Sequence, residues 1–171
     1  MTADKHSFSV ALDNGITIRS AVRDDAATID ALLRQLAKDI GEPGDYQNSM
    51  DALASHGFGE QPHFSALLAS DHARTIGLCL YFPEYSTWRG EAGVYVQDLF
   101  VDASVRGTGL GRSLVDHALA HASRLWAARY IRLAVHRHNE AARQFYQKMG
   151  FDTDQDNAIM IRKAHTPPPA P

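Results

Sequence analysis

The sequence predicts a single α+β domain, a three-layer α/β arrangement in which helices flank one central sheet. Two kinds of segment carry this prediction, and they follow one another along the 171 residues without an internal repeat. In one kind, β-branched and aromatic residues alternate with polar ones, which is typical of strands. In the other kind, apolar residues recur every three or four positions, which predicts helices with one buried stripe. The length and the 44% hydrophobic content suit one core.

The first half of the chain predicts three strands and two helices. The expected elements are a strand at 16–18, a helix at 24–40, a weaker helix at 46–55, and strands at 64–69 and 75–82. Asp24 and Asp25 can cap the first helix, and its apolar stripe includes Ile29 and Leu33. A turn at 71–72 is expected to join the last two strands into a hairpin.

The second half predicts strands and helices in alternation. The expected elements are a central strand at 93–101, a long helix at 109–128, a strand at 130–135, a helix at 139–149 and a last strand at 158–161. Gln97 and Asp98 interrupt the otherwise β-branched and aromatic central strand, which marks them as candidate functional groups. Asn139 is expected to cap the shorter helix, and Gly150 to end it.

Composition and charge exclude several classes of partner. The formal net charge of −3 leaves no basic surplus for a phosphate backbone or an anionic membrane. The longest apolar run, 76–82, is far shorter than the roughly 20 residues of a membrane span. The polar segment 1–9 has no hydrophobic signal core. We therefore expect a soluble, cytoplasmic protein with no nucleic-acid or membrane partner.

Three further expectations concern the chain ends and single side chains. The predicted domain covers 16–163, between an N-terminal extension at 1–15 and a Pro-rich tail at 164–171 that we expect to be disordered. The single cysteine, Cys79, has no partner for an internal disulfide and is predicted to be a buried strand residue. His117 and His121 are spaced four apart, but without the glutamate of a His-Glu-x-x-His site we expect them on a solvated helix face.

A glycine-rich loop between the central strand and the long helix predicts a phosphate site. The loop reads Arg106-Gly107-Thr108-Gly109-Leu110-Gly111. A helix start after a strand brings free backbone N–H groups and the positive end of the helix dipole to one place. Glycine lets the backbone approach a ligand closely, while Arg106 and Arg112 add positive charge.

The spacing of the loop disfavours two common nucleotide motifs. A Walker A loop requires Lys before Ser or Thr, but Gly111 is followed by Arg112 and Ser113. A dinucleotide fingerprint requires glycine at 112 and an acidic residue about 20 positions later, whereas 131–135 contains no acid. A glycine-rich turn without a ligand remains an alternative.

The loop does match the Arg/Gln-x-x-Gly-x-Gly/Ala signature of GNAT acetyltransferases, through Arg106, Gly109 and Gly111. A strand ending in Leu99-Phe100-Val101 precedes the loop, and a segment at 139–151 follows in the order of that family. Over about 17–163 the chain therefore resembles the GNAT superfamily. It is most similar to the diamine (spermidine/spermine) acetyltransferases, through the segments 57–62, 85–90 and 95–101.

The resemblance implies the GNAT acyl-CoA N-acyltransferase fold, with a mixed, mostly antiparallel sheet. It also implies an acetyltransferase of class EC 2.3.1 that takes acetyl-CoA as co-substrate and needs no metal. The implied acceptor is a primary amine of a small molecule, either a diamine or a lysine-like amine, and this amine attacks the acetyl group directly. The residues it assigns to the coenzyme are Leu99, Phe100, Val101, Arg106, Gly107, Thr108, Gly109, Leu110, Gly111, Arg112 and Asn139. A homodimer is also implied by the resemblance.

The resemblance assigns two catalytic roles. Tyr146 matches the tyrosine general acid of the family, because a phenol and a departing thiol have pKa values within about two units. Core packing beside Phe145 is the alternative for Tyr146. Diamine acetyltransferases carry a glutamate where this chain has Gln97, and an amide cannot accept a proton at neutral pH. We expect Asp98, the nearest carboxylate, to act as base through water, with a structural hydrogen bond as its alternative role.

Three departures from the diamine acetyltransferases bear on function. Three positions that are acidic in that group are not acidic here, namely Ile40, Ser86 and Gln97. Because each buried ammonium group needs an acidic partner, this difference favours a small amine over a long polyamine as the acceptor. A true polyamine acetyltransferase remains an alternative. The loss of the glutamate at Gln97 also leaves open a non-catalytic acyl-CoA-binding module.

Overall fold

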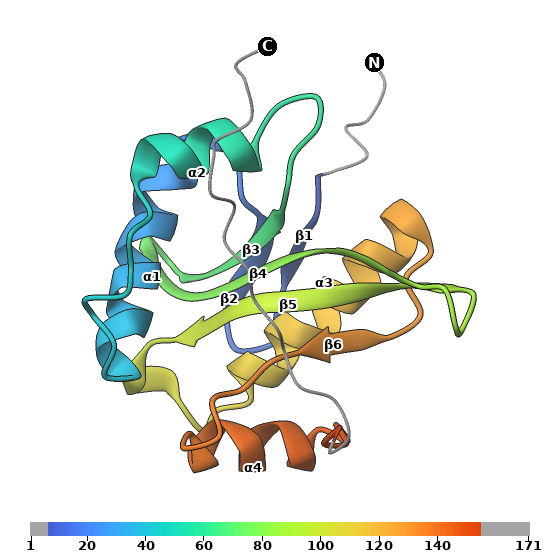
Figure 1. Cartoon of the computed structure of the whole chain (residues 1–171). Helices are drawn as coiled ribbons and strands as arrows, with labels where there is room; N and C mark the ends of the chain where they lie inside the picture. Colours follow the sequence, from blue (N-terminus) through green and yellow to red (C-terminus); the bar gives the residue numbers. More distant parts are fainter. Residues whose placement is uncertain (1–6, 155–171) are drawn as a thin grey trace. The chain divides into compact units, whose positions relative to one another are not determined.

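The computed structural model describes residues 7–154 (Figure 1). These residues form six strands and four α-helices, with two short 3-10 turns. The chain divides into two compact units, Met1–Arg137 and His138–Pro171. Of the helices in the described part of the chain, none combines the length and the apolar content that a bilayer span requires.

The first unit contains one six-stranded sheet, with the strands in sequence order from β1 to β6. The strands are β1 (Ser9–Ala11), β2 (Ile16–Ser20), β3 (Ser65–Asp71), β4 (Arg74–Ser86), β5 (Glu91–Val101) and β6 (Ile131–Leu133). Every neighbouring pair is antiparallel except β5 and β6, which are parallel. The mixed, mostly antiparallel sheet expected from the sequence is confirmed.

Helices cover both faces of this sheet (Figure 1). One face packs against α1 (Ala26–Asp39) and α2 (Met50–Gly57), whose buried residues include Ile29, Leu33 and Leu53. The other face packs against α3 (Leu110–Trp126), through the stripe that contains Leu114 and Ala118. The spacing of apolar residues every three or four positions therefore identified the buried faces of α1 and α3 correctly, and the three-layer prediction is confirmed.

Several element boundaries differ from those expected. α2 begins at Met50 rather than near 46, because the Ser49 hydroxyl accepts a hydrogen bond from the Ala52 N–H at 3.2 Å and caps the helix there. β4 continues to Ser86, four residues beyond the expected strand end. β6 ends at Leu133, although the sequence predicted a strand to 135.

One further difference falls near the N-terminus. β1, at Ser9–Ala11, was not expected as a strand, and it pairs with β2 at the edge of the sheet. Three residues are too few to show an alternating pattern, so propensity alone could not identify it. The predicted strand at 158–161 and the predicted tail at 164–171 lie outside the described residues.

The core beneath α3 contains a buried polar pair that the sequence did not predict. The Tyr81 hydroxyl lies 2.5 Å from His121 Nδ1, and His121 is only 3% exposed. The expectation of a solvated helix face is therefore wrong for His121, because β4 supplies a polar partner that offsets the cost of burying the imidazole. Cys79 is buried in β4, as expected.

The second unit contains α4 (Glu140–Lys148). The Asn139 side chain accepts a hydrogen bond from the Ala142 N–H at 3.0 Å, which confirms the predicted cap. The Tyr146 ring packs against Phe145 and Phe151, with ring centroids 5.0 and 5.4 Å apart. Gly150 follows the helix at a φ of 93°, a left-handed conformation that glycine adopts without strain.

Candidate functional site

A β-bulge interrupts β5 at the two polar residues that the sequence singled out. Leu80 of β4 pairs with Asp98, whereas the next residue, Tyr81, pairs with Val96. Gln97 is therefore the additional residue of the bulge. Because side chains alternate between the faces of a strand, one extra residue reverses the alternation on its far side.

The bulge places both polar side chains on the same face of the sheet. The β5 side chains that pack in the core beneath α3 are Val94 and Val96 before the bulge and Leu99 and Val101 after it. Gln97 and Asp98 lie between these pairs, and both side chains line a pocket on the opposite face. A regular strand would have directed one of the two toward α3.

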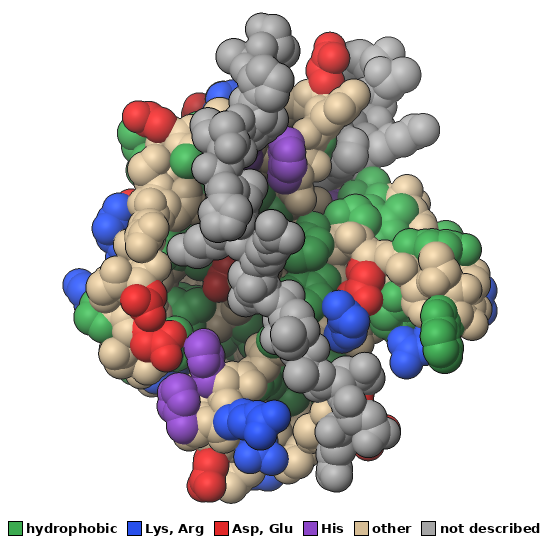
Figure 2. All heavy atoms as spheres, in the orientation of Figure 1, with side chains coloured by type: hydrophobic (Ala, Val, Ile, Leu, Met, Phe, Trp, Pro, Cys, Tyr) green, Lys and Arg blue, Asp and Glu red, His purple; other side chains and the backbone are tan. Residues whose placement is uncertain are grey.

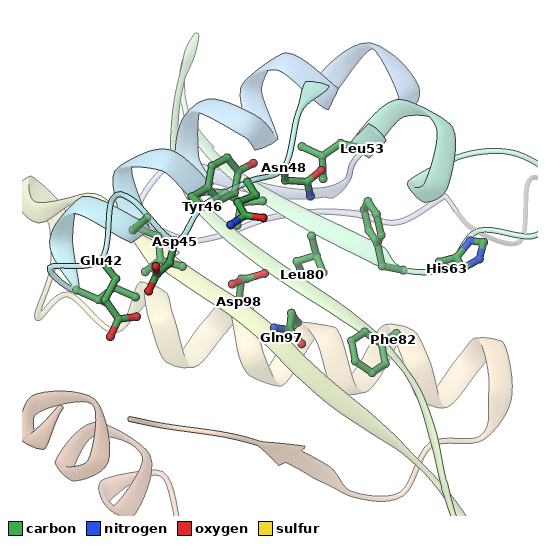
Figure 3. A pocket seen from close by; sticks show the side chains of 16 residues that line it. Glu42, Asp45, Tyr46, Asn48, Leu53, His63, Leu80, Phe82, Gln97 and Asp98 are labelled. Carbon is green, nitrogen blue, oxygen red and sulfur yellow. The ribbon is translucent and has the colours of Figure 1, made fainter. Parts of the chain in front are cut away.

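The pocket has a volume of about 630 Å³ and lies between β4, β5, α1 and the connection from α1 to α2. Figure 3 shows Glu42 and Asp45 at one end, His63 and Phe82 at the other, and Asp98 between them. In the space-filling view, apolar and acidic side chains meet in a hollow at the left of the face shown (Figure 2). Among the described residues that line the pocket, none is a lysine or an arginine. The cavity therefore suits a cationic ligand.

Burial changes the acid–base behaviour of Asp98. Removal from water disfavours the carboxylate and raises the pKa of Asp98 to about 6. At neutral pH the group is still ionised, but it accepts a proton more readily than an ordinary aspartate. A carboxylate with a raised pKa in a cleft is a candidate general base.

Tyr46 also lines the pocket and fixes the connection between α1 and α2. Its hydroxyl donates a hydrogen bond to Asp30 Oδ1 at 2.8 Å, and the Arg34 guanidinium lies 4.9 Å from the centre of its ring. Burial and the Asp30 carboxylate raise the pKa of Tyr46 well above the usual tyrosine value. The phenol proton is therefore held on Tyr46, which supports a structural role rather than proton transfer.

β5 loses its β6 neighbour immediately before the bulge. In the described residues the parallel pairing ends where Val96 faces Leu133. The Asp102 N–H donates to Ile76 O at 2.9 Å, on the β4 side. Since backbone groups alternate in direction along a strand, those of Leu99 and Val101 are directed away from β4, toward the side where β6 has ended. An extended ligand with amide groups can bind such an edge as an added strand.

The glycine-rich loop leaves room for a phosphate at the start of α3. Gly107 and Gly109 have φ values of 81° and 90°, and among the described residues, chain neighbours aside, no atom lies within 4 Å of the position that a Cβ would take on either. Gly109 is the N-cap of α3 and provides no side-chain cap, and a helix start of this kind can donate its first N–H groups to an anion. The residues present therefore fit a pyrophosphate.

The predicted site residues fall into both units of the chain. The structure brings Asp98, the segment 99–101 and the loop 106–112 together along β5 and the start of α3. Asn139 and Tyr146 belong to the second unit. The coenzyme and catalytic roles of all these residues stay predictions. Sequence reasoning missed Glu42 and Asp45, which lie in an irregular connection without a motif.

Comparison with known proteins decides the family. Residues 31–151, well over half of the chain, match the Acetyltransferase (GNAT) family. The chain belongs to the GNAT family. It is therefore an acetyltransferase, and GNAT acetyltransferases use acetyl-CoA as co-substrate. The predicted fold class and family resemblance are both confirmed.

The chain is also similar to individual acetyltransferases. The chain is 32% identical over 141 residues to thialysine N-epsilon-acetyltransferase of Mus musculus, covering 78% of this chain and 82% of the relative. It is 30% identical over 78 residues to spermine/spermidine N(1)-acetyltransferase of Bacillus subtilis, covering 44% of this chain and 51% of the relative. A crystal structure of an aminoglycoside acetyltransferase from an uncultured soil sample has a TM-score of 0.73 at 14% identity, covering 89% of this chain and 98% of that one. That last likeness concerns the fold alone.

The open loop generates a prediction about ligand stabilisation. Acetyl-CoA at 100 times its dissociation constant is expected to stabilise the fold by about 2.7 kcal/mol, since it binds the folded state. Gly109→Val should abolish this stabilisation, because the side chain enters the space left for the pyrophosphate and the backbone has a φ of 90°. Thermal unfolding with and without acetyl-CoA measures both effects.

Gly15→Val is the matched control. Gly15 has a φ of 83° with open space at its Cβ position, so valine brings the same backbone strain at the turn between β1 and β2. This variant is expected to unfold at a lower temperature but to keep the full acetyl-CoA shift. If ATP or NAD stabilised the wild-type protein and acetyl-CoA did not, the coenzyme site would be misassigned.

Proposed function

We propose that this protein transfers the acetyl group of acetyl-CoA to a primary amine of a small molecule by direct attack. The bulge in β5 is the observation that carries the proposal. It directs Asp98 into the acidic pocket, while the main chain of the adjacent Leu99 is directed toward the open edge beside β6. One strand thus offers a base to the acceptor and an amide-binding edge to the coenzyme.

Coenzyme binding in this proposal uses the backbone more than side chains. The pyrophosphate accepts hydrogen bonds from N–H groups of the loop 107–112, where the dipole of α3 favours a negative charge. Pantetheine pairs with the main chain of Leu99 and with the Val101 N–H, since the Val101 carbonyl already accepts a hydrogen bond from Arg106. The Asn139 carbonyl oxygen caps α4, and its amide nitrogen remains a donor for the pantetheine arm.

The proposed reaction moves three protons. An ammonium group with a solution pKa near 10 loses a proton to Asp98, directly or through water. The neutral amine attacks the thioester carbonyl, so that a C–N bond forms, the C–S bond breaks, and the thiolate takes the Tyr146 phenol proton. The nitrogen of the new amide loses its second proton to the Tyr146 phenolate, directly or through water, which restores the phenol. Because the pKa of Asp98 is raised to about 6, the difference between the pKa values of the amine and of Asp98 is smaller by about two units. The equilibrium constant for proton transfer from the ammonium group to Asp98 is therefore more favourable by a factor of about 100.

Asp98→Asn tests the base. In the wild-type enzyme, kcat/KM should rise with pH through about 6, because protonation of Asp98 removes the base. The variant should lose this acid limb and about 10²- to 10⁴-fold in kcat. Since folding raises the pKa of Asp98, the carboxylate destabilises the fold above pH 6. The variant should therefore have the higher Tm at pH 8, and its advantage should shrink between pH 6 and 4.

The opposite changes in Tm and pH dependence would assign Asp98 a structural role instead of the role of base. A structural hydrogen bond predicts that Asp98→Asn lowers the Tm and keeps the acid limb. Asp45→Asn removes another carboxylate of the same pocket and serves as the control. It is expected to raise the KM for the amine and to leave the acid limb near pH 6 in place.

Tyr146→Phe tests the acid. The substitution keeps the ring that packs against Phe145 and Phe151 and removes the hydroxyl alone. Single-turnover rates are expected to fall by about 10²- to 10⁴-fold, while the acetyl-CoA Kd stays within about twofold, because the proton is needed only in the transition state. Tyr85→Phe, at a side chain that is 63% exposed, controls for the loss of a hydroxyl. An unchanged rate in Tyr146→Phe would return this residue to a packing role.

The charges of the pocket bear on the acceptor. Ile40 and Gln97, which replace acidic residues of the diamine acetyltransferases, both line it. Two other carboxylates, which could have replaced these missing charges, form ion pairs with arginine. Asp39 pairs with Arg106, and Glu84 pairs with Arg132 at 3.1 Å. The pocket therefore has one carboxylate at its centre, Asp98, and two at one end.

This distribution suits an acceptor with two nearby cationic groups. The reacting amine lies at Asp98, and a second ammonium group lies near Glu42 and Asp45. A lysine-like amino acid and a short diamine both provide such a pair. The similarity to thialysine N-epsilon-acetyltransferases supports the lysine-like acceptor.

Polyamine acetylation is the second candidate function. It is favoured by Glu42 and Asp45 and by the similarity to the spermine/spermidine N(1)-acetyltransferase. We expect kcat/KM for a lysine-like amine or a short diamine to exceed that for spermidine at the same salt concentration. A tenfold preference for spermidine, about 1.4 kcal/mol, would establish the second candidate instead.

The same assay distinguishes an active acetyltransferase from a non-catalytic acyl-CoA-binding module. Such a module would bind the coenzyme but release no thiol with any amine. The cytoplasmic location, expected from the composition, and the homodimer, implied by the family resemblance, both stay predictions.

A further inference from the structure

Arg106 connects the glycine-rich loop to two other segments of the first unit. Its Nε donates a hydrogen bond to the Val101 carbonyl at 2.9 Å, at the end of β5. Its guanidinium also donates to Asp39 Oδ2, at the end of α1. The sequence had placed Arg106 as a positive charge beside the phosphate, but in the structure the guanidinium is directed toward a carboxylate 67 positions away in the chain.

Asp39 occupies a position that is unfavourable for a carboxylate. It is the last residue of α1, where the helix dipole is negative and a cation is preferred. Its two oxygens are both engaged, because Oδ1 accepts from Gln35 Nε2 at 2.8 Å and Oδ2 accepts from Arg106. Asp39 therefore has one partner within its own helix and one, Arg106, outside it.

The end of α1 is also part of the acceptor pocket. Ile40 follows Asp39 directly, and Glu42 lies two residues further, and both line the pocket. The Arg106–Asp39 pair therefore lies between the loop that we assign to the coenzyme and the wall of the pocket that we assign to the amine.

We propose that Asp39 is a positioning residue that acts through Arg106 and connects the coenzyme loop to the acceptor pocket. The proposal rests on the function proposed above. Within the loop, the Thr108 hydroxyl donates to Val105 O at 2.8 Å, whereas the Arg106 guanidinium reaches the end of α1 through Asp39. Loss of the carboxylate frees the guanidinium and removes the tie from the loop to α1. Both binding sites then become less ordered.

A double-mutant cycle tests whether Asp39 acts through Arg106. Asp39→Asn is combined with Arg106→Gln, and the CoA Kd, the KM for the amine, kcat and Tm are measured for all four proteins. Alone, Asp39→Asn should raise the CoA Kd and the amine KM by about fivefold each, a typical coupling between sites, with kcat within about twofold. In the Arg106→Gln background, Asp39→Asn should change neither quantity by more than about twofold.

Two further variants serve as controls. Asp13→Asn removes the same charge from an exposed turn between β1 and β2 and is expected to change neither constant. Asp39→Glu keeps the charge on a longer side chain and should restore part of both affinities.

Equal effects of Asp39→Asn in both backgrounds would overturn the proposal, because Asp39 would then not act through Arg106. So would an effect confined to one of the two substrates, since the pair would then not connect the sites. Failure of the proposed function has a different signature: the wild-type protein itself would not bind CoA or would release no thiol with any amine.

Discussion

The additional residue in β5 is the constraint on which the geometry of the site depends. A regular strand would send Gln97 and Asp98 to opposite faces, and one of them would enter the apolar core beneath α3. The bulge at Gln97 keeps both polar groups on the pocket face and returns Leu99 and Val101 to the core. It thereby allows a strand to be apolar toward α3 and functional toward the pocket.

The end of the β5–β6 pairing adds a second function to the same strand. In the part of the chain that the structure describes, β6 stops opposite Val96, so the main chain of Leu99 has no β6 neighbour. The loop that follows leads directly to the start of α3, where the dipole favours an anion. The acceptor pocket and the coenzyme edge that we propose thus share one continuous segment from 97 to 111.

Ion pairs with arginine distinguish Asp39 and Glu84 from the carboxylates that we propose to act on the ligand. Asp39 and Glu84 are neutralised by Arg106 and Arg132, so they contribute little to the field in the pocket. Asp98 instead is partly buried, and its pKa is raised to about 6 by that burial. All three residues are acidic, so residue type alone does not distinguish their roles. Their different roles follow from which side chains the fold brings within reach.

The sequence by itself determined the layers, the faces of α1 and α3, the loop before α3 and the family, because hydrophobic periodicity and glycine spacing are local properties. It also identified Gln97 and Asp98, as two consecutive polar residues in an apolar strand. Only the tertiary structure decided that both face one pocket, that Glu42 and Asp45 join them, that His121 is buried against Tyr81, and that Arg106 pairs with Asp39. These features depend on strand register and on contacts between residues up to 67 positions apart, which no local pattern encodes.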